Sequence, residues 1–485
     1  MKPAVNGVRV REDVWKLATW DDTLLWYARA VARMRQLPIR NSASWRYQAA
    51  IHAYLRNQDP LAAETDSLPS LSHRRRFWNQ CQHGSWYFLP WHRLYLGFFE
   101  QIVRSHVVAL GGPDHWALPY WNYSDEGNLQ AKLVRREFRD ASLPDGSPNS
   151  LADAKRGQTP SLSQQGRQTG DFGIDSSDTD LGCLLTVPFR TGRFGVPSGF
   201  GGPRTGFQHS GGVIGDLERV PHGSIHVAVS GWMGAFETAG LDPLFWLHHA
   251  NIDRLWEVWL GRRSQFQNPT DPSWGAPSGT DFDFHDATGA IATHTADEVI
   301  DTTTPLLSYR YEDISDPLAT AGLAEEEIIM GTGPATLVGA SEETVRLSSS
   351  PTTANVQIDP TAITENLAAL AEGEPQRIYL NMENIVGAGK ASSYKVFVNA
   401  PADDPEGTSH YAGLLPMFGL AEASRRDDPH GGSGLTYVLD ITDAVNRLKQ
   451  RNEWNEENLK VTFVPKQREQ DGEGPQVGRI SLYYR

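Results

Sequence analysis

Cysteine is scarce in this sequence, and long apolar runs are missing. Cys81 and Cys183 are the only two cysteines among 485 residues, which excludes a framework of several disulfides and is typical of a protein from a reducing compartment. No stretch approaches the ~18 consecutive apolar residues that favour a membrane-spanning helix. The opening MKPAVNGVRV contains neither the apolar core of a secretory signal nor a twin arginine before one. The sequence therefore predicts a cytoplasmic protein.

Positive charge is also in short supply. Lys and Arg total 44 against 59 Asp and Glu, so the formal net charge is −15, and the isoelectric point is near 5.5. An acidic protein repels the phosphates of nucleic acids and the head groups of anionic membranes, so neither is an expected partner. A chain of this length can form two or three domains, each with an apolar core of its own. The composition fits a globular enzyme whose partners are small molecules.

Histidine, in contrast, occurs in an informative pattern. Six of the 15 histidines form two sets of three, which are His52, His83 and His92 in the first half and then His222, His226 and His249. Neutral imidazole is a ligand suited to copper, zinc, iron and nickel, and two all-nitrogen sets without a carboxylate indicate a paired metal site. The pattern predicts an enzyme.

The spacing within the second set predicts that its imidazoles share one ion. His222 and His226 are four residues apart in PHGSIH, so on a helix both rings leave the same face one turn apart. His249 lies in DPLFWLHHANID, where Asp242 and Pro243 have the features of a helix start. The helix has an apolar face, which predicts that it is buried. The face consists of Leu244, Leu247, Ile252, Leu255 and Trp256.

The first set is predicted to lie on two helices and one loop. His52 ends the amphipathic stretch 45–52, and His92 follows an apolar run, residues 86–91, that enters a helix. His83 would lie on the loop before that run. Four helices would then converge on the metals, and the cores of helix bundles commonly hold metal sites.

Two motifs carry a resemblance to a known family. HGSWYFLPWHRLYLGFFE (residues 83–100) resembles the copper-A signature of the tyrosinase and polyphenol oxidase family, and DPLFWLHHANID (residues 242–253) resembles its copper-B signature. The resemblance covers roughly residues 9–312. It implies a mainly α-helical catalytic domain with a four-helix bundle around a dicopper site, with two copper ions as cofactors and O₂ as co-substrate. By the family pattern His249 is the copper-B ligand, and His248 is a neighbour that packs or hydrogen-bonds.

The remaining histidines have no such context and are predicted to be ordinary surface or core residues. They are His73, His106, His115, His209, His285, His294, His410 and His430.

The resemblance also implies a covalent bond and a general base. Cys81 precedes His83 by two residues, and in fungal members a cysteine in that place forms a thioether to the histidine ring; the alternative is a small buried apolar residue. Glu218 matches the E-x-x-P-H pattern of plant-type members, in which the carboxylate holds a water that deprotonates a phenol. Its alternative is a surface ion pair with Arg219. Asp253 is a candidate to orient His249, with a structural cap or a salt bridge to Arg254 as the alternative.

Three further residues are predicted to shape the substrate pocket. Phe236 matches the aromatic gate of plant-type members, where it would stack a phenol ring; the alternative is a core aromatic. Val227 would give the entrance an apolar wall, which favours simple phenols over free tyrosine. Gly223 stands where many monophenol hydroxylases have Asn, and this departure favours oxidation of o-diphenols over hydroxylation of monophenols.

The resemblance implies oxidation of o-diphenols to o-quinones with O₂, with monophenol hydroxylation or o-aminophenol oxidation as further activities. One alternative is a haemocyanin-like dicopper oxygen-binding protein, which has the same histidines. Another is a zinc hydrolase, for which a catalytic carboxylate among the ligands is lacking.

The pattern of the chain changes after the metal motifs, which predicts a multidomain α+β protein. Tyr309-Arg310-Tyr311 is similar to the Y-x-Y motif that closes the catalytic domain of plant-type members, so residues 1–312 are predicted to form that domain and 313–335 a linker. Within 336–485 the apolar period becomes two, which predicts a β-sandwich or barrel. Its seven expected strands are 344–347, 355–358, 377–382, 394–398, 435–441, 459–463 and 479–484.

This C-terminal part resembles the domain that shields the active site in latent plant-type enzymes. The resemblance lies in YKVFVN and HYAGLLPMFG. Leu414, Leu415, Met417 and Phe418, flanked by Gly413 and Gly419, form an apolar tip that is unusual for a solvent loop. The tip either docks on the mouth of the copper pocket as a lid or packs into its own domain.

Overall fold

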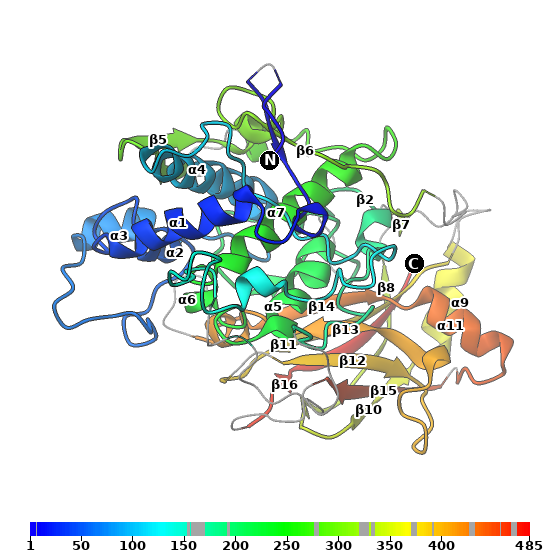
Figure 1. The fold of residues 1–485 in the computed structure, drawn as a ribbon. Coiled ribbons are helices and arrows are strands. Elements are labelled where there is room, and N and C mark those ends of the chain that lie inside the picture. Colours follow the sequence, from blue (N-terminus) through cyan, green and yellow to red (C-terminus); the bar gives the residue numbers. More distant parts are fainter. Residues whose placement is uncertain are drawn as a thin grey trace.

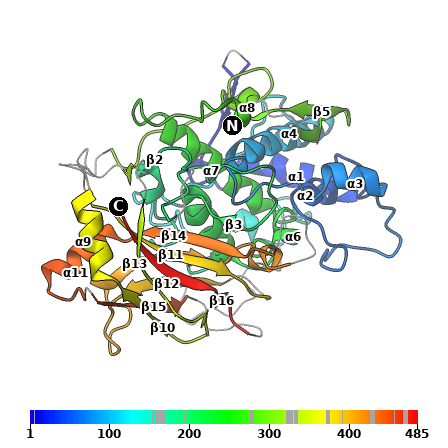
Figure 2. The same cartoon turned by 180° about the vertical axis from the view of Figure 1, so that it is seen from behind.

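The computed structural model divides into a helical half and a sheet half. It describes residues 1–5, 7–152, 156, 170–191, 195–275, 281–319, 329–330, 335–369, 376–389, 392–425, 432–455, 457–466 and 473–485. Figure 1 shows the helices of the first 275 residues gathered on one side and the strands from residue 336 onward on the other, and Figure 2 shows the same division from behind. None of the helices in these ranges is both long and apolar enough to cross a membrane.

The helical half is built around two long buried helices, α4 (Phe88–Ala109) and α7 (Pro243–Leu260). Polar side chains cap several of its helices, because Asp21, Ser44 and Asp242 each accept a hydrogen bond from the first turn that follows them. The predicted helix start at Asp242 and Pro243 is confirmed. The helices are α1 (Asp22–Gln36), α2 (Trp45–His52), α3 (Leu71–Phe77), α4 (Phe88–Ala109), α5 (Ser224–Val229), α6 (Phe236–Ala239), α7 (Pro243–Leu260) and α8 (Pro272–Gly275).

Short elements connect these helices. The turns of 3₁₀-helix are η1 (Val14–Lys16), η2 (Arg136–Phe138), η3 (Gly182–Leu185) and η5 (Ala296–Val299), and η4 (Glu218–Gly223) is a π-helical turn that leads directly into α5. The short strands are β1 (Arg9–Arg11), β2 (Thr186–Val187), β3 (Gly212–Val213), β4 (Phe282–His285), β5 (Ile291–His294), β6 (Tyr309–Tyr311) and β7 (Ile329–Met330). The stretch 126–215 is mostly loop in its described parts, as predicted.

The sheet half contains all seven expected strands and others that the sequence pattern did not reveal. Its strands are β8 (Thr336–Ala340), β9 (Val345–Arg346), β10 (Thr352–Ile358), β11 (Ile378–Ile385), β12 (Ser393–Val398), β13 (Tyr411–Pro416), β14 (Leu435–Asp440), β15 (Asn458–Pro465), β16 (Gln476–Val477) and β17 (Arg479–Tyr484). Its helices are α9 (Pro360–Ala369), η7 (Thr408–His410), α10 (Leu420–Ala423) and α11 (Thr442–Gln450). Strands β8, β13 and β16 and the helices were not predicted.

Nine strands form one sheet in the order β13-β12-β15-β10-β8-β17-β11-β14-β3. All its pairs are antiparallel except the parallel pair of β14 with β3, a strand of the helical half. The Tyr437 hydroxyl of β14 donates to the Pro416 carbonyl of β13, so the sheet curls until distant strands meet. In β10 the buried residues Ala354, Val356 and Ile358 alternate with exposed ones, which is the two-residue period of a half-buried strand. The sheet half therefore has its own apolar core.

A buried charge network ties the first and last segments of the helical half together. β1 pairs in parallel with β6. Asp253 of α7 accepts hydrogen bonds from the hydroxyls of Tyr309 and Tyr311 and from Nε of Arg93, and Arg11 Nη1 lies 3.5 Å from it. Burial acts to raise the pKa of Asp253, but Arg93 and Arg11 outweigh burial and hold the pKa below its ordinary value.

Asp253 therefore has a structural role, as the alternative held, but its partners are Arg93, Arg11 and two tyrosines and not Arg254. His249 Nδ1 has no hydrogen-bond partner, so Asp253 does not orient this ring. Arg254 instead donates its Nε–H to the Asp313 carbonyl. The sequence could not reveal this, because the actual partners lie far from residue 253 along the chain.

This network generates a stability prediction. Asp253→Asn should lower the free energy of unfolding by about 3–5 kcal/mol, because it leaves buried guanidinium groups without their counter-charge. Urea denaturation followed by tryptophan fluorescence measures the change. Asp283→Asn is the control: it removes a carboxylate paired with exposed Arg76 and should leave the midpoint nearly unchanged. Equal midpoints for the two variants would contradict the role of the network.

Candidate functional site

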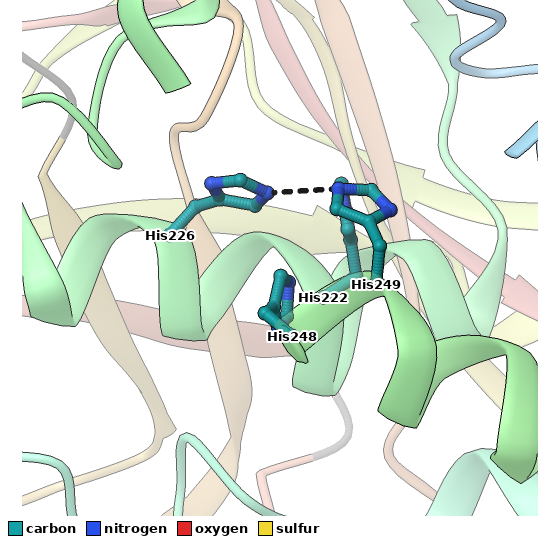
Figure 3. Close-up of side chains that lie close together, drawn as sticks. All are labelled: His222, His226, His248 and His249. Carbon is teal, nitrogen blue, oxygen red and sulfur yellow. Dashed lines mark hydrogen bonds between the residues drawn. The ribbon is translucent and has the colours of Figure 1, made fainter. Parts of the chain in front are cut away.

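Seven buried histidines from distant segments meet at the centre of the helical half. The nitrogen atoms of His52, His83 and His92 lie within 4.8 Å of one another, and those of His222, His226, His248 and His249 form a second such group. His52 ends α2, His83 lies on the loop before α4, and His92 is on α4. The second group comes from η4, α5 and α7, and Figure 3 shows its four rings turned toward one space. The structure thus brings together all six histidines of the predicted sets.

Backbone carbonyls fix the orientation of five of these rings. An imidazole that donates its Nδ1–H to a carbonyl leaves Nε2 as an unprotonated lone pair, which is the form that binds a metal. The five contacts are His52 Nδ1 to Phe236 O at 3.3 Å, His83 Nδ1 to His209 O at 3.2 Å, His92 Nδ1 to Phe88 O at 2.8 Å, His222 Nδ1 to Glu218 O at 3.1 Å and His226 Nδ1 to Met233 O at 2.7 Å.

The opposite nitrogens of these rings are buried without ordinary partners. Nε2 of His52, His83, His92 and His222 accepts or donates no hydrogen bond, although buried polar atoms in proteins are normally satisfied. His226 Nε2 lies 3.4 Å from His249 Nε2 (Figure 3). Metal ligation accounts for such a set of converging lone pairs, so the residues fit two ions of a metal that prefers nitrogen.

Burial also keeps the rings uncharged. It lowers the pKa of His92 and of His226 to about 3, and it lowers the pKa of His52, His83, His222 and His249 well below the ordinary value, together with neighbouring imidazoles. Neutral imidazole is the form that ligates a metal, because protonation removes the lone pair. The rings are therefore ready to bind near neutral pH.

The adjacent rings of His248 and His249 have different surroundings. His249 stacks on His92 at 4.6 Å between ring centroids, so it contacts the first set as well as the second. The ring centroid of His248 lies 5.5 Å from that of His222 and 5.7 Å from that of Tyr123. His249 thus occupies the position between the two groups.

Glu218 lies beside both histidine groups. Its side chain is only 4% exposed, and the Gly84 N–H lies 3.0 and 2.9 Å from its two carboxylate oxygens. Burial raises the pKa of Glu218 to about 8, against the lowering effect of hydrogen bonds from the Gly84 and Gly215 backbone. The alternative of a surface ion pair with Arg219 is wrong, since Glu218 is buried and Arg219 donates to the Leu414 carbonyl.

Two of the three expected pocket residues line the cavity, and the third lies in the core. The first two are Phe236 and Gly223, and the third is Val227. The Phe236 ring lies 4.5 Å from the ring of His83, and both line a cavity with Gly223. A Cβ added to Gly223 would lie 3.3 Å from Cγ of Pro416, so the glycine leaves room for the sheet half. Val227 is buried in the apolar core of the helical half. Their effects on substrate choice stay predictions.

The apolar tip of the sheet half reaches the histidines. Phe418 stacks on His226 with ring centroids 3.9 Å apart and an interplanar angle of 8°, and it lies 4.9 Å from Phe236. Leu415 and Met417 instead pack into the core of the sheet half. The tip is therefore divided between the histidines and its own core, and its action as a lid stays a prediction. The cavity left between Phe418, Glu218 and the histidines is about 20 Å³, enough for little more than one water molecule.

Cys81 has an unexpected neighbour. It is buried and free, and its Sγ lies 3.1 Å from Nδ1 of His209, which also lies 3.0 Å from the Cys81 carbonyl. The expected thioether to His83 stays a prediction. His209 was predicted to be an ordinary histidine, yet its carbonyl orients His83. A backbone contact of this kind has no signal in the sequence.

Comparison with known proteins gives matches over the whole chain. Residues 42–262 match the common central domain of tyrosinase, and residues 334–485 match a domain of unknown function. A tyrosinase of Hahella sp. (strain CCB-MM4) is 35% identical over 490 residues, which cover 98% of this chain and 99% of that protein. A latent-form chloroplastic polyphenol oxidase of Prunus armeniaca is 31% identical over 312 residues, which cover 61% of this chain and 47% of that protein.

Solved structures with the same arrangement of helices and sheet are known. Latent apple tyrosinase has a TM-score of 0.63 at 22% identity, with coverage of 100% of this chain and 99% of that chain. A recombinant mushroom tyrosinase has a TM-score of 0.54 at 15% identity, with coverage of 99% and 94%. At these identities the likeness shows the fold alone.

Proposed function

The chain belongs to the tyrosinase and polyphenol oxidase family of type 3 copper oxidoreductases, and we propose on this premise that it oxidises simple o-diphenols to o-quinones with O₂. Its cofactors are two copper ions. The observation that carries the proposal is the set of buried Nε2 lone pairs that face one another without other partners. Copper, when bound there, supplies the binding and reduction of O₂.

We assign one ion to each histidine set. His52, His83 and His92 would hold copper A, and His222, His226 and His249 would hold copper B. In this assignment α2, α4, α5 and α7 form the four-helix bundle around the site. The contacts of His249 with both sets support it over His248 as the ligand.

The neighbouring side chains would bind and orient the substrate. A phenol that entered the site would stack on Phe236, which already lies against the ring of His83. The Glu218 carboxylate, held by the Gly84 N–H, would accept the proton of the phenol hydroxyl directly or through one water. Gly223 offers no side-chain amide to share that water, which favours o-diphenols over monophenols.

Access to this pocket depends on the C-terminal sheet half. Phe418 occupies the space over His226, and a Cβ added to Gly419 would lie 2.6 Å from Phe236, so the tip fits closely between the two rings. A phenol is far larger than the remaining cavity. The sheet half would therefore act as a lid, and the docked chain would have low activity.

The first experiment measures metal content and oxidation together. Protein expressed with copper should contain two copper ions per chain. It should form quinone from 4-methylcatechol faster than it hydroxylates 4-methylphenol. A parallel assay with o-aminophenol tests for o-aminophenol oxidation. Removal of copper with a chelator should abolish quinone formation. Bound zinc would contradict the proposal, as would copper that binds O₂ reversibly without forming quinone in any variant.

The assignment within the adjacent pair gives a second prediction. His249→Ala should lower bound copper from two ions to one per chain, because two imidazoles hold an ion poorly. His248→Ala should retain two. Elemental analysis of the purified variants measures both. Retention of two ions by His249→Ala and loss by His248→Ala would reverse the assignment.

The lid gives a third prediction. Phe418→Ala should raise kcat/KM for 4-methylcatechol, because it removes the ring that fills the pocket while leaving every proposed ligand in place. Met417→Leu is the matched control, since Met417 packs into the sheet core and this exchange conserves volume. Unchanged kcat/KM in Phe418→Ala, or an equal rise in both variants, would mean that Phe418 does not close the site.

A further inference from the structure

One short stretch contacts both a histidine of the site and the C-terminal sheet. We call residues 208–214 the bridging segment. Its first residues hold the loop that carries His83: the Gln208 carbonyl accepts from the His83 backbone N–H at 2.9 Å, and the His209 carbonyl accepts from His83 Nδ1 at 3.2 Å. Its last residues include β3, which extends the sheet beside β14.

The bridging segment and the His83 loop are in direct backbone contact. The Gln208 N–H donates to Oε1 of Gln82 at 2.7 Å. Gly84 has a φ of +58°, and a Cβ there would lie 2.2 Å from the Gly211 carbonyl oxygen, a distance that no side chain tolerates. A displacement of the bridging segment must therefore move the loop that carries His83.

The other end of the bridging segment is fixed by the sheet half. The Gly212 N–H donates to the Gly434 carbonyl at 2.9 Å, and the Ile214 N–H donates to the Thr436 carbonyl at 3.1 Å. The Ile214 side chain belongs to the apolar core of the sheet half, although the residue precedes that half by more than a hundred positions. The segment is thus held by strand pairing with β14 and by one buried side chain.

His83 depends on this support more than its neighbours in the set do. It lies on a loop, whereas His92 is held within α4 by the carbonyl of Phe88, four residues earlier on the same helix. Hydrogen bonds that orient a ligating histidine commonly change metal affinity by about 10–100-fold. For His83 the acceptor of that hydrogen bond is the carbonyl of His209, three residues before the strand that pairs with the sheet.

We propose that the C-terminal sheet positions His83 through the bridging segment, so that the docked sheet raises the affinity of the copper A site as well as covering the pocket. This inference rests on the proposed function, because it takes His83 as a copper ligand. Ile214 is then a positioning residue, acting on copper through His209 and His83.

The test compares copper release from full-length variants. Ile214→Pro removes the N–H that donates to Thr436, whereas Ile214→Val keeps the N–H and an almost equal apolar side chain. With excess chelator, Ile214→Pro should lose one of its two copper ions about tenfold faster than the wild type. Ile214→Val should release copper at the wild-type rate.

Labelling of free imidazoles identifies the site that is lost. After partial release, diethyl pyrocarbonate and peptide mapping should find His83 modified in Ile214→Pro, while His222, His226 and His249 stay protected by their ion. Copper release from Ile214→Pro at the wild-type rate, or simultaneous loss of both ions, would overturn the inference.

A second variant serves if Ile214→Pro does not fold. Ile214→Ala keeps the N–H but withdraws the side chain from the sheet core, so it should release copper A at an intermediate rate. Release at the wild-type rate would overturn the inference.

The failure of this inference is distinguishable from that of the proposed function. A wild-type protein that binds no copper would contradict both the proposed function and this inference. A wild-type protein with two copper ions and quinone formation, combined with unchanged copper release in the variants, would remove only the role of the bridging segment.

Discussion

The site depends on one recurring interaction, the hydrogen bond from an imidazole Nδ1–H to a backbone carbonyl. It fixes the ring and leaves the Nε2 lone pair directed at the shared centre. Two of the carbonyls belong to the turns that carry their own histidines, as for His92 and His222. The others come from Phe236 at the start of α6 and from His209 and Met233 outside the helices. The orientation of the rings therefore requires segments far apart in the sequence to be folded together, and the Phe236 carbonyl is the partner of His52.

The sheet half is joined to this site by polar contacts as well as by the ring of Phe418. Lys466 pairs with buried Asp178 at 2.5 Å, and Arg425 pairs with Glu237 at 2.7 Å, next to Phe236. Together with the parallel pairing of β3 and β14, these contacts explain why an apolar tip can remain seated over uncharged imidazoles. Phe418 alone would bury one ring, whereas the contact between the two halves combines ion pairs, strand pairing and apolar packing.

Local signals in the sequence account for much of this architecture. The four-residue spacing of His222 and His226, the Asp242-Pro243 helix start and the two-residue period after residue 336 each reflect geometry within a few neighbouring residues. For that reason the helices around the histidines and seven strands were predictable. Strand β13 was missed because its apolar tip and flanking glycines resemble a loop, and β8 was missed because its burial does not alternate.

The sequence by itself therefore determined which residue types form the metal site, the family of the chain and the presence of a second, β-rich part. Only the tertiary structure decided the partners: Asp253 with distant tyrosines and arginines rather than His249, Cys81 beside His209, and β3 within the sheet of the C-terminal half. The physical reason is that periodicity and capping act over one or two turns of chain. Contacts through backbone carbonyls and buried charges, in contrast, join residues whose separation in sequence carries no pattern.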